Sequence, residues 1–164
     1  MKTRFLFLLN LLFILSCNAQ IRKTQRIQMK DYPSFYENLT GNLNKVIAHK
    51  QDFYGKPLSL FLSELENQNI HVNSYTPGFD NTSMKLEFVD DWDTYEEANK
   101  NNYKMPYIII NLKTPFDYQK AMVLLDKNHS YWGEEEENFY KDLIIKDIQF
   151  MDVSGLKTQQ LKAK

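Results

Sequence analysis

The sequence predicts a single α+β domain, in which a small sheet of about four strands has helices packed against it. The length of 164 residues suits one domain. Segments with apolar residues at helical spacing share the chain with segments in which apolar and polar residues alternate. The run MPYIIINL at 105–112 is apolar on both faces, and this pattern predicts a strand in the middle of the sheet.

Two helices are predicted in the first half of the domain. Between Pro33 and Lys50 apolar residues recur at helical spacing, with Gly41 as a weak point. The second helix covers 57–67, and Pro57 suits its first turn because the missing N–H is not needed there. Its apolar stripe consists of Leu58, Phe61, Leu62 and Leu65.

Three more helices are predicted further along the chain. Thr94 and Glu97 have the spacing of a capping box, which predicts the start of a short helix. Thr114 is the predicted N-cap of a helix that ends near residue 127. The acidic start of the segment 134–142 is favoured by the helix dipole.

The remaining strands follow from short apolar or alternating segments. Residues 70–74 are predicted to form a strand that leads into a turn at 76–78. Apolar and charged residues alternate over 84–88, as in a half-buried strand, and 144–153 is the last predicted strand.

The net charge of −1 conceals an asymmetry along the chain. All 21 acidic residues lie at or after Asp31, where they face 14 basic residues, a net charge of −7. Lysine and arginine supply most of the affinity for phosphate backbones, so an acidic domain is a poor candidate for nucleic-acid binding.

The first 19 residues have the features of a secretory signal peptide. Lys2 and Arg4 precede an apolar run of roughly 12 residues, and small residues follow it. A membrane-spanning helix needs about 20 apolar residues, so the run is too short to remain as an anchor. The sequence therefore predicts export.

Cys17, the single cysteine of the chain, lies at the end of this run. The stretch Ile14-Leu15-Ser16-Cys17 resembles the lipobox of bacterial lipoproteins, and the resemblance covers the first twenty residues. It implies that Cys17 is lipidated and becomes the first residue of the mature protein in the bacterial cell envelope. The alternative is a cut after Ala19, which removes Cys17 and releases a secreted protein.

The polar, basic and aperiodic stretch 20–33 suits a tether between a lipid anchor and a folded domain, and it favours the lipidated form. The α+β domain is predicted to cover 34–153, and 154–164 is a predicted flexible tail. No part of the chain beyond residue 20 resembles a family.

Motifs for catalysis and cofactor binding are missing from the sequence. It contains no phosphate loop, no HExxH, no nucleophile elbow and no cysteine pair. His49, His71 and His129 share no ligand spacing. We therefore predict no catalytic residue, no cofactor and no metal site, and a non-enzymatic role is favoured.

One segment has the spacing of a calcium loop. Oxygen-bearing residues occupy positions 1, 3, 5, 9 and 12 of the loop that begins at Asp126 and ends at Glu137. Tyr131 stands where glycine normally permits the sharp turn, and Gly133 replaces the usual aliphatic residue. We predict that this segment is a connection between helices and not a calcium site.

Both tryptophans adjoin acidic residues, Trp92 in DDWD and Trp132 before GEEEE. The sequence favours an exported, lipid-anchored cell-envelope protein that has a binding or structural role with a protein or small ligand. The alternative is a small secreted hydrolase or carbohydrate-binding protein that uses carboxylates near Trp92 or Trp132. An indole at the edge of the core, with its N–H toward water, is the commoner outcome for both residues.

Overall fold

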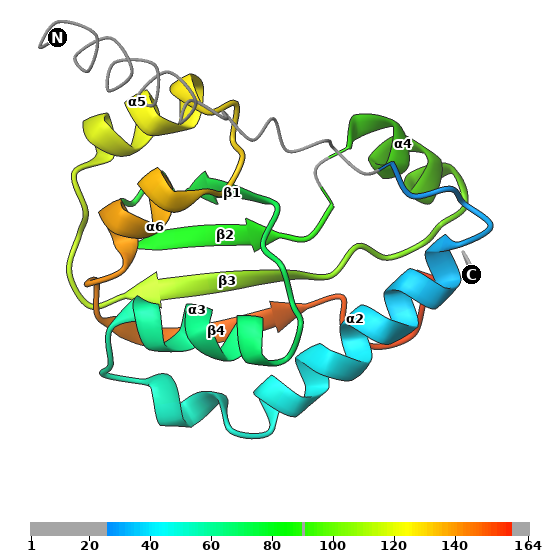
Figure 1. Cartoon of the computed structure of the whole chain (residues 1–164), viewed down its shortest axis with the longest axis horizontal. Helices are drawn as coiled ribbons and strands as arrows, with labels where there is room; N and C mark the ends of the chain where they lie inside the picture. Colours follow the sequence, from blue (N-terminus) through cyan, green and yellow to red (C-terminus); the bar gives the residue numbers. More distant parts are fainter. Residues whose placement is uncertain (1–25, 90, 159–164) are drawn as a thin grey trace, which may run out of the picture.

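The computed structural model describes residues 26–89 and 91–158 and confirms the α+β class. In this part of the chain four strands form one antiparallel sheet in the order β1-β2-β3-β4 (Figure 1). The strands are β1 (Ser74–Pro77), β2 (Ser83–Glu87), β3 (Tyr107–Leu112) and β4 (Ile145–Met151). β3 pairs with β2 and β4, so its predicted place in the middle of the sheet is confirmed.

The predicted helices are all present, with shifted ends. They are α2 (Tyr32–Ile47), α3 (Leu58–Asn67), α4 (Trp92–Lys100), α5 (Tyr118–Lys127) and α6 (Glu134–Tyr140). A short 3-10 helix, η1 (Lys50–Phe53), follows α2. α2 runs through Gly41 without a break, so the predicted weak point does not interrupt it. None of the helices in the described ranges is long and apolar enough to span a membrane.

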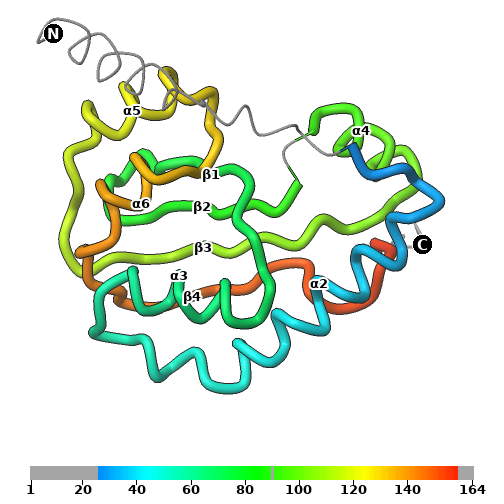
Figure 2. The backbone as a smooth tube through the Cα atoms, viewed as in Figure 1, coloured from blue at the N-terminus to red at the C-terminus, as the bar shows by residue number. Residues whose placement is uncertain are grey.

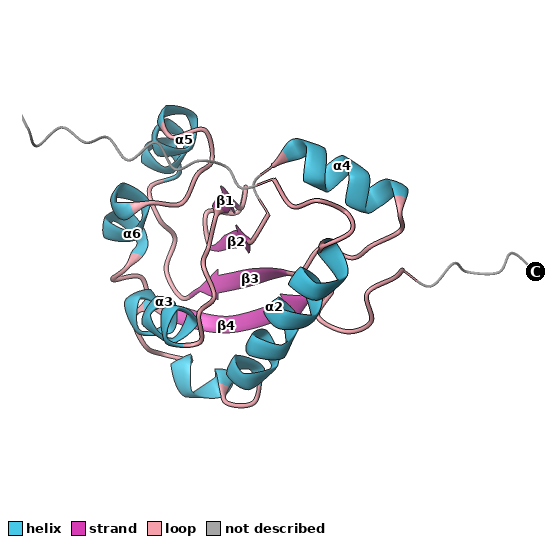
Figure 3. Cartoon of the chain, turned by 45° about the vertical axis from the view of Figure 1, so that its right-hand side comes forward, coloured by secondary structure: helices cyan, strands magenta, loops and turns pink. Residues whose placement is uncertain are grey.

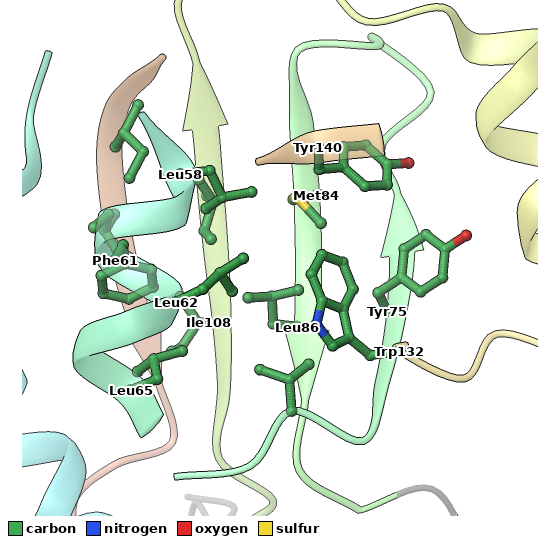
Figure 4. Packing of buried hydrophobic residues seen from close by; sticks show 14 of the residues in the cluster. Leu58, Phe61, Leu62, Leu65, Tyr75, Met84, Leu86, Ile108, Trp132 and Tyr140 are labelled. Atoms are coloured by element: carbon green, nitrogen blue, oxygen red, sulfur yellow. The ribbon is translucent and has the colours of Figure 1, made fainter. Parts of the chain in front are cut away.

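The core lies between one face of the sheet and the helices, and α3 and α6 lie in front of that face (Figure 1). The predicted stripe of α3 is buried as a unit: Leu58, Phe61, Leu62 and Leu65 are each at most 6% exposed. These side chains face Met84, Leu86 and Ile108 from the sheet (Figure 4). The viewpoint of Figure 3 shows the same arrangement of helices around the strands.

The opposite face of the sheet is half exposed. Along β3, Ile108 and Ile110 are fully buried, whereas Tyr107, Ile109 and Asn111 are only partly covered. The run is apolar on both faces, but only one face of the strand is fully buried. Antiparallel sheets commonly keep one face toward solvent, and here the apolar Ile109 lies on that face.

Both edges of the sheet are covered by irregular segments. Beside β1, the Tyr75 N–H donates to the carbonyl of Ser130 at 3.0 Å. Beside β4, the Gly55 N–H donates to the carbonyl of Ile145 at 2.8 Å, and the Ile145 N–H donates to that of Lys56. These bonds pair one position of each edge strand and so shorten the free edges that promote aggregation.

The first strand lies further along the chain than predicted. β1 begins at Ser74, and the predicted turn residues Thr76 and Pro77 belong to it, with the turn moved to 78–82. Ile70 and Val72 are buried, so their apolar pattern comes from packing and not from strand pairing. Pro77 is tolerated because β1 is an edge strand of the sheet.

Two helices use a different N-cap from the predicted one. α4 is capped by Asp91, whose side chain accepts from the Thr94 N–H, so Thr94 lies inside the helix. α5 is capped by Asp117 and not by Thr114. The Phe116 N–H is held by the carbonyl of Asn81 at 2.9 Å, and this tertiary bond keeps the preceding residues out of the helix.

The folded part extends beyond the predicted limits of 34–153 at both ends. Residues 26–31, from the predicted tether, contact α4 (Figure 2). The predicted tail also begins in ordered structure, because the Lys104 N–H donates to the carbonyl of Leu156 at 2.8 Å and Tyr103 forms a bridge with Lys157. These two segments, α4 and the start of α2 share a small second core of Tyr32, Tyr36 and Ala98.

Candidate functional site

A groove of about 610 Å³ lies beside α2 and is called here the α2 groove. One wall comes from α2 and the segment before it, and the other from residues 69–73 and Phe88. The groove therefore depends on segments that lie about 40 positions apart in the sequence.

The floor of the groove is apolar. Leu39, Ile70 and Phe88 are buried there, and Phe35 is half-buried. Leu39 and Phe35 are four residues apart and therefore lie on one side of α2. A ligand in the groove meets carbon surface on its inner side.

The rim of the groove is polar and rich in amides. It carries Gln28, Asn38, Asn42, Asn69, His71 and Asn73. The Asn73 side chain donates to the carbonyl of Phe88 at 2.7 Å, and this bond holds the two ends of one wall together. Amides both donate and accept hydrogen bonds, so the rim suits neutral polar groups. Arg26 and Asp31 are the charged residues among the described lining.

The structure places Trp92 outside the α2 groove, on the surface of α4. Its ring is 69% exposed and stacks on Tyr95, with 5.5 Å between the ring centroids. The neighbouring acids have structural partners: Asp91 caps α4, and Asp93 pairs with Arg26 at 3.1 Å.

Trp132, in contrast, is part of the core. It is 6% exposed and packs edge-on against Tyr75, with 5.5 Å between the ring centroids (Figure 4). The expectation of an indole at the core edge therefore fails for Trp132. The two tryptophans do not meet, because one lies on α4 and the other in the core behind β1.

Glu136 is a buried carboxylate that the sequence did not reveal. It is 1% exposed and accepts from the Asn128 amide at 2.5 Å, whereas its neighbour Glu135 is exposed and pairs with Lys127 at 2.7 Å. Four consecutive glutamates at 134–137 give no local signal for which one turns inward. The Asn128 amide bonds both Glu135 and Glu136, so this bond alone does not select the buried one.

Two tyrosine hydroxyls lie in the same part of the core. Tyr75 and Tyr140 are fully buried, and neither hydroxyl has a hydrogen-bond partner among the described residues. Both hydroxyls point away from the leucines of α3 (Figure 4). Burial raises the pKa of both phenols well above its usual range, and the charge of Glu136 adds to the effect, so both stay neutral.

Four carboxyl groups in the described part of the chain have a pKa that departs from its ordinary value. Each one with a displaced pKa is shifted downward by local hydrogen bonds: Asp80, Asp91, Asp117 and Glu135. General acids in hydrolases commonly have a raised pKa. These four groups are structural acceptors.

The segment 126–137, which has the spacing of a calcium loop, spans the connection between α5 and α6. His129 and Ser130 both have positive φ, and the side chains of Lys127 and Asn128 bind the glutamates of α6.

The other two histidines lie apart from this segment. The His49 ring lies 3.4 Å from the Glu64 carboxylate, and His71 is on the rim of the α2 groove. Over 26–89 and 91–158, no three histidine, aspartate or glutamate side chains cluster in a way that could hold a metal ion.

The predicted signal peptide and Cys17 lie outside the described residues. Comparison of the chain with protein-family models, with curated proteins and with solved structures gave no match.

Proposed function

We propose that this chain is an exported, lipid-anchored binding protein of the bacterial cell envelope that holds a small neutral polar ligand in the α2 groove. The groove carries the proposal, because an apolar floor and an amide rim are combined in one cavity. Its volume of about 610 Å³ lies within the range of roughly 300–1,000 Å³ usual for ligand sites. The lipobox-like stretch before Cys17 supports the anchor.

A carbohydrate is the ligand class that this groove suits best. A sugar ring has an apolar face, which can lie against Phe35 and the floor, and hydroxyls that can bond with Asn38 and Asn69 at the rim. The acidic domain disfavours an anionic ligand.

A hydrolase is less well supported by this geometry. Glycoside hydrolysis commonly uses two carboxyl groups on either side of the scissile bond. The described lining of the α2 groove has a single carboxylate, Asp31. The acids near Trp92 serve as cap and ion-pair partner, so a non-enzymatic role is the better proposal.

Calorimetric titration with neutral oligosaccharides, such as maltotriose, cellotriose and chitotriose, tests the ligand class. We expect one of them to bind, and Asn38→Ala to weaken its binding by about 2- to 10-fold through the loss of one hydrogen bond. Asn44→Ala is the matched control, because Asn44 is exposed on the same helix and does not line the groove. No heat from any of these sugars, or equal effects of both variants, contradicts the proposed ligand site.

Intact-mass analysis of membrane-extracted protein tests the anchor. We expect a chain that begins at Cys17 and carries lipid. An unmodified chain that begins at Gln20 contradicts the lipid anchor and supports secretion.

A further inference from the structure

The exposed face of α4 carries an unusual pair of aromatic side chains. Trp92 is 69% exposed, Tyr95 is 39% exposed, and their rings are stacked with 14° between the planes. The stacking presents both rings to solvent as one rigid surface. Tryptophan and tyrosine are the residues enriched where proteins meet the headgroups of a membrane.

The same helix is the attachment point of the first described segment. The Arg26 guanidinium pairs with Asp93 at 3.1 Å and with Glu97 at 2.9 Å. The Ile27 N–H donates to the Thr94 hydroxyl at 3.1 Å. The chain therefore leaves the domain at α4.

The length of chain before this point limits how the domain can face a membrane. Eight residues separate Cys17 from Arg26 in the sequence, and the nine steps from one Cα to the next span at most about 32 Å when fully extended. A globular domain of this size is roughly 36 Å across. An anchor at Cys17 thus holds the α4 end within about 32 Å of the bilayer, less than the width of the domain, whereas the turn between β1 and β2 lies at the other end of the sheet (Figure 1).

We infer that the Trp92–Tyr95 surface of α4 rests on the lipid headgroups and orients the anchored domain. The inference rests on the proposed lipid anchor. Ion pairs reduce the negative charge of α4 but do not remove it, because Arg26 is shared by Asp93 and Glu97 and Lys100 pairs with Glu96 at 3.2 Å. The residues between Cys17 and Arg26 add Arg22 and Lys23 and no acid, which offsets the remaining negative charge, so a zwitterionic lipid surface suits this end of the domain.

Fluorescence quenching tests the inference on the lipidated full-length protein. The protein is placed in phosphatidylcholine vesicles whose acyl chains are brominated near the headgroup. Trp132 is buried and common to all variants, so Trp92 is the accessible emitter. We expect the Trp92 part of the emission to be quenched and the quenching to be lost in Trp92→Phe.

The matched control moves the exposed indole to the other end of the sheet. Phe79 is 94% exposed in the turn between β1 and β2, so Phe79→Trp is combined with Trp92→Phe. We expect no quenching from this double variant. Equal quenching of an indole at 79 and at 92 overturns the orientation and leaves the proposed function intact. The same holds if Trp92 is not quenched although the intact mass of the protein shows that it carries lipid. A mass without lipid overturns the anchor and the orientation together.

Discussion

The Asp91 carboxylate accepts two hydrogen bonds from Thr94, one from the hydroxyl at 2.5 Å and one from the backbone N–H at 2.7 Å. The Thr94 side chain is fully buried and also contacts the backbone of Ile27. Asp91 thus caps α4, and the Thr94 hydroxyl ties the helix to the first described residues. The hydroxyl bond is the largest of the effects that hold the pKa of Asp91 below its usual range.

We expect Asp91→Ala to lower the free energy of unfolding by about 1 kcal/mol at pH 7, through loss of the N-cap. The pKa of Asp91 is lowered in the folded state. The charged cap therefore contributes its full stability at a pH above the unfolded-state pKa of 3.8, and this contribution is lost as the pH falls through the folded-state pKa. The difference between wild type and Asp91→Ala should therefore shrink below about pH 4. Urea denaturation at pH 7 and at pH 3 measures this, and an equal difference at both contradicts it.

Truncating Ile110 to alanine should lower the free energy of unfolding by about 2–5 kcal/mol, because its side chain is fully buried in the central strand. Ile109→Ala is the matched control on the half-exposed face of the same strand, and it should cost less. Chemical denaturation of both variants checks the prediction. A loss below about 0.5 kcal/mol for Ile110→Ala would contradict the burial.

Tyr140→Phe should leave the free energy of unfolding unchanged or raise it, since it removes a buried hydroxyl that has no partner in the described structure. Tyr36→Phe should lower it by about 0.5–1.5 kcal/mol, because the Tyr36 hydroxyl donates to the carbonyl of Asp152 at 2.7 Å. Urea denaturation compares the two variants. A loss of about 1 kcal/mol for Tyr140→Phe would reveal a water or other partner in the core.

The segment from Asp126 to Glu137 should not bind calcium. Lys127 and Asn128 already bind the glutamates of α6, and the four glutamates have a sufficient role at a helix start. We expect the same melting temperature with millimolar calcium and with chelator. A tight site at 100-fold excess of calcium would add about 2.7 kcal/mol, and a rise that Glu137→Ala abolishes would prove the prediction wrong.

Local patterns were sufficient to predict the class of most elements. The stripe from Leu58 to Leu65 predicted α3 and its buried face, because side chains three and four positions apart share one side of a helix. The apolar run of β3 predicted a central strand. The first strand was predicted too early in the chain, because Ile70 and Val72 are buried by packing without strand pairing. The apolar pattern indicates that residues are buried, but it does not indicate what buries them.

The sequence by itself determined the single α+β domain, its helix stripes and its central strand, because these depend on which neighbouring residues are apolar. Tertiary contacts alone decided the docking of Arg26 on α4 and the bond from the Phe116 N–H to Asn81. They also built the α2 groove, whose walls join residues from α2 with residues 69–73. Each of these features needs a partner far away in the chain, and the position of that partner exists only once the sheet and helices have packed.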